Sequence, residues 1–544
     1  MGSIFLRGTR VTMGLVATSL FAEPSPAESA AARLVEAHVT FLADDLLEGR
    51  AAGTRGYDLA AHYVATEFRK IGLVPGGPAN GYLQPVALLE SKRDYTGARF
   101  ALRSAGDADV QLEALNDFIA APSGGRMTAD VTASAVFVGF GVHAPQQKYS
   151  DLDGVDLQGK IAVVFFGAPA SLPGTERAHF SNAHTKAEEL ARRGAIGMIT
   201  VNTPAEDKRR PWATTLASVR FPAMSLVGPD GAVVDVVPAM QVTASMSPRG
   251  TGKLFARSAR PFAELVAAAE RSEPQHAALG VTVSIQAQSV QQPVSSHNVL
   301  GILPGTDPAR ARDYLVITSH LDHLGIGTAV DGDAIYNGAI DNAIGVASLL
   351  AAANHLATSG VRLRRPILFA AVTAEEKGLL GARHLSRTPP AGGRYVANLN
   401  VDAGPFFAPL RAAIGMGREH TTMGAVFEKV TQRLNWAVRP DPRPEERRFV
   451  RSDQYSFVRE GVPALRVLAA AESTDPAINL AEVDRIFWRD RYHKPSDDLK
   501  HPIHFPSAGA FAVLLAEVAR TIADDERDPA WLPGDFFGDR FGRK

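Results

Sequence analysis

The 544-residue chain contains no cysteine, so neither a disulfide nor a thiol nucleophile can contribute to its stability or chemistry. It also lacks an excess of either charge, because 57 Lys and Arg stand against 58 Asp and Glu. This balance, without a basic run on any predicted helix or strand, argues against nucleic acid as a partner. What is present, 45% hydrophobic residues with 48 Gly and 35 Pro, is typical of globular structure.

Long apolar runs are also missing. After the N-terminus no segment reaches about 18 uninterrupted apolar residues, so we expect no membrane span in the mature chain. At the N-terminus, Arg7 and Arg10 precede an apolar stretch, residues 11–22, that is too short to cross a bilayer. Small residues and the sequence Glu23-Pro24-Ser25-Pro26 follow. This pattern predicts a signal peptide over residues 1–22 and export to the periplasm or the medium, with a frayed helix as the alternative.

The length of the chain predicts more than one domain. Helical periodicity marks residues 28–47 and 57–71, and Gly72 is placed to end the second helix. Short β segments dominate residues 130–260, and from about residue 281 strands and helices alternate. Alternation of this kind predicts an α/β fold, a mostly parallel or mixed central sheet with helices on both faces, beside a separate β-rich domain.

Five side chains that can ligate a transition metal follow apolar runs or lie in loops of the second half: His320, Asp341, Glu376, Asp402 and His493. Their distance in sequence does not separate them in space, because the carboxyl ends of parallel strands meet at one edge of a sheet. Imidazole nitrogens and carboxylate oxygens suit zinc. Together with Glu375, which could act as a base, these residues predict the site of a two-metal hydrolase.

The segment around His320 has two interpretations. His320 ends the apolar run 314–319, and the carboxylate of Asp322 could fix the tautomer of a metal-binding imidazole. Alone, the His-x-Asp pair would be a surface pair. We interpret His323 as a pocket or surface residue, since one strand end rarely supplies adjacent ligands.

The acidic positions are equally ambiguous when taken singly. Asp341 precedes an apolar helical segment and could be its N-cap, or it could bridge two cations with its two oxygens. Glu375 and Glu376 follow the strand 367–373 and could form an exposed acidic turn, although adjacent carboxylates at a strand end are costly without cations. His493 lies in a Pro-containing loop that could be purely structural. The whole set, in one order, favours the metal site.

These stretches resemble peptidase family M28, which includes aminopeptidases with two co-catalytic zinc ions. The matching segments are His320-Leu-Asp322, Gly338-Ala-Ile-Asp341-Asn342-Ala, Glu375-Glu376, Asn400-Val-Asp402, Tyr492-His493-Lys-Pro-Ser-Asp-Asp498 and Arg451-Ser-Asp453-Gln-Tyr-Ser-Phe457. Residues 129–260 resemble a protease-associated domain inserted before the catalytic sheet. The resemblance then divides the chain into an N-terminal helical part of the catalytic domain (23–128), the inserted domain, the zinc peptidase domain (261–530) and a loose tail (531–544). Gln454 departs from the family pattern, where histidine is common.

The resemblance implies two Zn²⁺ per chain. His320 and Asp402 would hold one ion, Glu376 and His493 the other, and Asp341 would bridge them. Glu375 would be the general base for a metal-bound water, and Asp322 would support the site from beside His320.

The implied function is that of a di-zinc exopeptidase acting on peptide substrates, and we favour an aminopeptidase. A carboxypeptidase or dipeptidase stays open, because the same metals can serve either end of a peptide. A carboxylate such as Asp453 would hold an α-amine, whereas Arg448 or Arg451 would hold an α-carboxylate. A glutaminyl-cyclase-like transferase and a catalytically dead binding protein are weaker alternatives.

Overall fold

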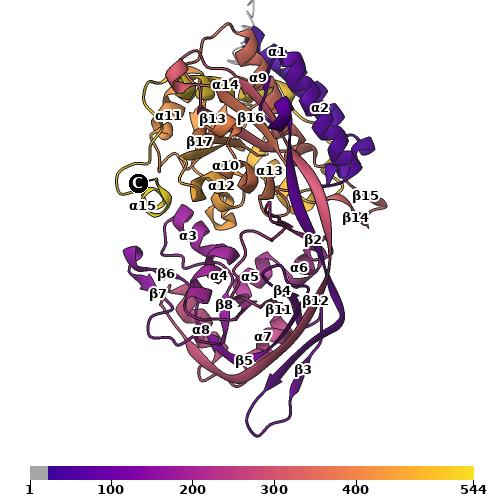
Figure 1. Ribbon diagram of the computed structural model, residues 1–544, viewed down its shortest axis with the longest axis vertical. Coiled ribbons are helices and arrows are strands. Elements are labelled where there is room, and N and C mark those ends of the chain that lie inside the picture. The colour runs from indigo at the N-terminus through magenta and orange to yellow at the C-terminus, as the bar shows by residue number, and fades with distance from the viewer. Residues whose placement is uncertain (1–22, 403, 544) are drawn as a thin grey trace, which may run out of the picture.

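The computed structural model describes residues 23–402 and 404–543, so the expected signal segment, residues 1–22, lies outside the described residues. Two parts are visible in Figure 1. The lower part comprises residues 104–276 and the adjoining ends of two long strands, and the upper part comprises the rest of the described chain. Two long strands join them.

A mixed sheet forms the centre of the upper part. Its four parallel strands are β13 (Asp313–His320), β16 (Ile367–Val372), β17 (Arg394–Val401) and β20 (Ala464–Ala469). They are flanked by the antiparallel strands β12 (Ala277–Leu303) and β18 (Ala412–Met416), in the order β18-β20-β17-β13-β16-β12. This arrangement confirms the predicted α/β fold.

Helices cover both faces of this sheet. Because successive side chains of a strand point to opposite faces, β13 places Leu315 and Ile317 in one core and Tyr314 and Val316 in another. The first core is covered by α1 (Pro26–Leu42), α2 (Arg55–Ile71), α9 (Ile344–Thr358) and α14 (Phe505–Asp524). The second core is covered by α10 (Leu380–Arg387) and α12 (Gln454–Arg459).

Local sequence fixes the ends of the two N-terminal helices. Ser25 and Glu28 form a reciprocal capping box at the start of α1, which satisfies backbone N–H groups that have no partner inside the helix. Thr54 caps α2, so the helix begins two residues before the predicted start. Gly72 ends α2 in the left-handed conformation, as predicted.

The lower part continues the same sheet. It adds β5 (Thr128–Phe137), β8 (Ile161–Phe165), β9 (Gly197–Val201), β11 (Val242–Met246) and β4 (Phe118–Pro122), in that order from β12. Among its helices are α3 (Gly174–Ser181), α4 (Ala183–Arg192) and α5 (Pro204–Arg209). Strand β4 and the adjoining end of β2 precede residue 129, so this sheet draws on more of the chain than the segment 129–260.

The connection between the parts is an antiparallel strand pair. Strand β2 (Leu83–Arg103) pairs with β12 from Leu83 opposite Val299 to Arg103 opposite Thr282. The sequence predicts two strands, 281–287 and 297–303, where the structure has one. The polar residues between them are not a turn, because they continue the ladder with β2 and leave their side chains partly exposed.

Two C-terminal segments differ in burial from what their sequences suggest. By length and composition α14 could span a membrane, but 72% of its apolar window is buried, so it is a core helix here. The expected loose tail contains a helix, α15 (Phe536–Phe541). Its Phe536 and Phe537 are buried and anchor the segment. The Gly, Asp and Arg content of the segment gives no sign of this apolar helix face.

Candidate metal centre

Three neighbouring parallel strands end at the candidate site. His320 is the last residue of β13, Asp402 directly follows β17, and the Glu375–Glu376 pair follows β16 after two residues. Asp341 lies in the single turn Ala339–Ala343 before α9. His493 lies in the loop after α13 (Leu480–Asp490). The topology of the sheet therefore brings together residues that are up to 173 positions apart.

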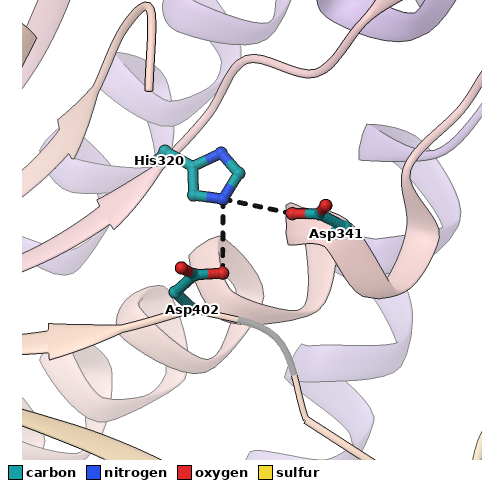
Figure 2. Close-up of side chains that lie close together, drawn as sticks. All are labelled: His320, Asp341 and Asp402. Atoms are coloured by element: carbon teal, nitrogen blue, oxygen red, sulfur yellow. Dashed lines mark ion pairs between the residues drawn. The ribbon is translucent and has the colours of Figure 1, made fainter. Parts of the chain in front are cut away.

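The first group of ligand atoms surrounds the imidazole of His320. Its Nε2 lies 3.2 Å from Oδ1 of Asp341 and 3.4 Å from Oδ1 of Asp402. Figure 2 shows both carboxylates directed at this one nitrogen. All three side chains are buried.

The second group uses the other oxygen of the same aspartate. Oδ2 of Asp341 lies 3.2 Å from Nε2 of His493, and that nitrogen lies 3.3 Å from Oε2 of Glu376. Asp341 thus presents one oxygen to each group, which is the geometry of a carboxylate that bridges two cations. The structure places all five predicted ligands in one cluster.

The donor set fits zinc ions. Zinc–ligand bonds of about 2.0–2.1 Å at tetrahedral angles put neighbouring ligand atoms about 3.3–3.4 Å apart, and the observed separations match this spacing. The buried Nε2 of His493 makes no hydrogen bond, although both carboxylates are close. Burial alone would raise the pKa of Asp341, but the imidazoles of His320 and His493 that face it hold this pKa well below its usual range, so this carboxylate is charged.

The structural alternatives for the acidic residues do not hold. Helix α9 begins at Ile344 with Ala343 as its N-cap, so Asp341 does not cap it. The Glu375–Glu376 pair does not open a helix either, because α10 begins only at Leu380. The side chain of Glu376 is only 6% exposed, which excludes an exposed acidic turn.

Asp322 supports the site differently from the prediction. Its backbone oxygen, not its carboxylate, lies 3.0 Å from Nδ1 of His320. Its carboxylate accepts hydrogen bonds from the backbone N–H groups of Glu375 (3.0 Å) and Glu376 (3.3 Å). The reason is spatial: the turn after β16 crosses directly beside Asp322. The carboxylate therefore orients the Glu375–Glu376 turn.

Further residues, to which the sequence assigned no role at the site, hold the ligands in place. Asp497 accepts hydrogen bonds from the backbone N–H groups of Ile340 and Asp341, both at 3.0 Å. Ser452 donates a hydrogen bond to Oδ2 of Asp402 at 2.6 Å, and Arg466 lies 3.0 Å from the same oxygen. Such contacts fix the direction of metal ligands.

His323 takes the first of its two predicted places, in the pocket. It is fully buried, its Nδ1 lies 2.9 Å from Oε1 of Glu376, and it approaches Oδ2 of Asp341 to 4.0 Å. It is therefore a residue of the site and not a surface residue. Strand β13 ends at His320, so the alternation of side chains along a strand does not decide where the side chain of His323 points.

Glu375 belongs to neither group of ligand atoms. Burial, with the nearby carboxylates of Asp402 and Glu376, raises its pKa well above its usual range. A carboxylate of raised pKa beside two cation sites is suited to accept and return a proton.

The candidate anchors for a substrate terminus lie nearby. Asp453 is fully buried, neither of its carboxylate oxygens has a hydrogen-bond partner among the described residues, and burial raises its pKa to about 8. Arg448 is buried and pairs with Asp441. The side chain of Arg451 is 43% exposed and has one long ion pair, 3.5 Å from Glu446.

Comparison with known proteins agrees with this geometry. Residues 298–519 match the model of Peptidase family M28. No curated protein sequence matches the chain. A similar solved structure is an aminopeptidase from Aneurinibacillus sp. strain AM-1, which is 18% identical, with 93% of this chain and 97% of that chain covered and a TM-score of 0.50. At this sequence identity, the similarity shows a shared fold.

Two further solved structures have lower TM-scores at the same identity of 18%. For a peptidase M28 precursor from Shewanella amazonensis SB2B, 93% of this chain and 99% of that chain are covered, with a TM-score of 0.44. For BSAP, a zinc aminopeptidase from Bacillus subtilis, the covered shares are 91% and 96% and the TM-score is 0.43.

Proposed function

Residues 298–519 belong to peptidase family M28, and on that premise we propose that this chain is an aminopeptidase that holds two zinc ions and removes N-terminal residues from peptides. The observation that carries the proposal is the position of Asp341. Its two carboxylate oxygens face two separate groups of ligands, each with an imidazole nitrogen and a second carboxylate.

His320 and Asp402 would hold one ion, Glu376 and His493 the second, and Asp341 would join both. When bound, two such zinc ions would polarise the scissile carbonyl and lower the pKa of an attacking water. Glu375 accepts the proton of that water and delivers it to the departing amine nitrogen. Asp322 holds the backbone of Glu375 so that the base keeps its direction.

Specificity for the amino end is supported by the acidic side chains around the centre. Glu375, Asp322 and Asp453 lie outside the two ligand groups, and carboxyl oxygens can accept hydrogen bonds from a substrate α-ammonium. The nearest candidates for an α-carboxylate anchor are less suitable, because Arg448 is already paired with Asp441 and Arg451 is half exposed. The fold shared with an aminopeptidase points the same way.

The proposal is tested by metal analysis and hydrolysis of leucyl p-nitroanilide, with and without a chelator. Glu375→Gln removes the base but no ligand, so metal content should stay near two per chain while kcat falls about 10²–10⁴-fold. Asp341→Asn weakens the bridge, so metal content should fall as well. Near-normal turnover by Glu375→Gln, or unchanged metal in Asp341→Asn, would contradict these roles.

We further propose that the enzyme acts after export and that residues 129–260 form a protease-associated domain. The apolar stretch 11–22 after Arg7 and Arg10 supports export. N-terminal sequencing of the protein from a secreting host should find Glu23 or a close neighbour as the first residue. An intact N-terminus in the cytoplasm would contradict export.

A further inference from the structure

A group of arginines lies where the lower part meets the upper part. Arg210 follows α5 of the lower part, and Arg447 lies in the upper part between the turns Pro444–Glu446 and Arg448–Val450. Both guanidinium groups lie over the ring of Phe166, at 5.3 Å and 4.2 Å from its centroid. One aromatic ring thus holds a cation from each part of the molecule.

Within the described residues, neither arginine forms an ion pair with a carboxylate. Glu206 pairs with Arg209 at 2.7 Å, and Glu446 pairs with Arg209 at 2.9 Å. Among the residues that the structure describes, no ion pair reaches Arg210 or Arg447. The Nε of Arg447 is buried without a hydrogen-bond partner. A buried donor without a partner is costly, and a bound acceptor would relieve that cost.

The surroundings of the pair are cationic as well. The charges of Arg209 and Arg451 act on both Arg210 and Arg447. Burial, together with these cations and against the effect of Glu206, lowers the pKa of Arg447 to about 10. Arg447 is half-buried and Arg210 is exposed. Like charges that lie together are stabilised by an anion, and the planar fork of a guanidinium suits a carboxylate.

The arginine pair and the metal centre share one charged neighbour, Arg451. Arg451, whose charge acts on Arg210, interacts electrostatically with Glu375 and Asp402 as well. An aminopeptidase substrate has a single residue on the amino side of the scissile bond. Apart from a carboxylate on the first side chain, every carboxylate of the substrate therefore lies after the scissile bond, in the leaving part of the peptide.

We propose that Arg210 and Arg447 form a carboxylate site for the leaving part of the substrate, so that the enzyme prefers short peptides with a free C-terminal carboxylate or an acidic residue after the scissile bond. This inference rests on the proposed aminopeptidase function. It gives the lower part a role in catalysis, because one of the two arginines comes from it.

The test compares leucylglycine with leucylglycinamide, which lacks the carboxylate, and with leucylaspartyl amide, which carries only a side-chain carboxylate. For the unmodified chain, kcat/KM should be about tenfold or more higher for the carboxylate substrates than for leucylglycinamide. Arg210→Gln and Arg447→Gln should remove most of that preference through KM. Turnover of leucylglycinamide should stay unchanged. The substrate with the larger loss identifies which carboxylate is bound.

Controls separate recognition from folding. Arg271→Gln removes an exposed charge of the lower part that pairs with Glu273, and it should leave the preference intact. Arg447→Lys keeps the charge without the fork and should retain part of the preference. Equal losses on the amide and the carboxylate peptides, or no preference in the unmodified chain, would overturn the proposal.

Failure of the proposed function would be recognised separately. Titration calorimetry of leucylglycine and leucylglycinamide into Glu375→Gln measures affinity without turnover. Tighter binding of leucylglycine than of leucylglycinamide supports the site if adding Arg447→Gln to Glu375→Gln removes the difference. This result would support the site even if the unmodified chain hydrolyses no aminoacyl substrate. Equal affinities would overturn it.

Discussion

Asp497 illustrates how a side chain outside the ligand set controls the metal centre. Its two oxygens each accept one backbone N–H, from Ile340 and Asp341. Both bonds are buried, and burial raises the pKa of Asp497 to about 6. Asp341 is thus held through its backbone N–H as well as through its carboxylate.

Asp497→Asn should weaken metal binding without removing a ligand. An amide offers one acceptor oxygen instead of two, so one backbone N–H loses its partner and Asp341 gains freedom. We expect about a 10–100-fold loss of metal affinity, measured by competition with a chelator. Asp498→Asn is the matched control, since that side chain accepts a bond from the backbone of Lys500 outside the centre. Equal affinities for both variants would contradict the role.

The sequence could predict ligands but not their supports. His320, Asp402 and the Glu375–Glu376 pair follow apolar runs, so the end of a buried strand could be recognised directly. Arg466 acts through a contact between segments far apart in the chain, and no local pattern marks it. Asp497 lies in a segment that resembles the family, but its bonds to the backbone of Ile340 and Asp341 could not be predicted from that segment. Of the two places predicted for His323, pocket and surface, the sequence could not choose, because its burial depends on Glu376 lying opposite.

Helices α1 and α14 pack closely at Gly509. A Cβ at this position would lie 2.6 Å from the Cα of Ala32 and 2.6 Å from the carbonyl oxygen of Glu28. These neighbours are backbone atoms and cannot rotate away. The pair of helices therefore depends on the absence of a side chain at one residue.

Gly509→Ala should destabilise the upper part by about 1–3 kcal/mol, because the helices must separate. The measurement is the denaturant midpoint of unfolding. Gly252→Ala is the matched control: it lies exposed in the helix Pro248–Leu254 with nothing within 4 Å of its Cβ position. That change should stabilise by about 0.5–1 kcal/mol through helix propensity. A neutral Gly509→Ala would show that the packing is not tight.

Predicted elements were most accurate where periodicity was strong. The helices α1, α2, α9 and α14 carry apolar residues at helical spacing, and the parallel strands are continuous apolar runs. The single strand β12 was missed, since its polar middle is explained only by pairing with β2. Helix α15 was missed because its apolar residues are few and its burial depends on the lower part.

His179 lies between the two parts of the molecule. It belongs to α3, its Nδ1 lies 2.5 Å from the hydroxyl of Tyr455 in α12, and its ring lies 5.5 Å from that of Phe536 in α15. Burial lowers the pKa of His179 to about 3. The imidazole is therefore neutral in the folded protein.

This histidine should make the protein less stable in acid. The unfolded imidazole binds a proton below about pH 6.5, whereas the folded one does not until about pH 3, so stability falls as pH falls through this window. The loss from this group is about 1.4 kcal/mol per pH unit. Asn has a polar atom near the position of Nδ1 but does not titrate. Denaturant midpoints should therefore fall less steeply between pH 6.5 and 4 for His179→Asn, and parallel curves would contradict the role.

The long pairing of β2 with β12 has a consequence for the architecture of the chain. Ser91 lies directly opposite Gln291, so residues 92–290 leave and rejoin the upper part at neighbouring points. A tight β-hairpin turn could join these two points and leave the strand order around the metal centre intact. The lower part is thus attached as an enlarged hairpin loop, a topology in which it could be gained or excised without rethreading the peptidase core.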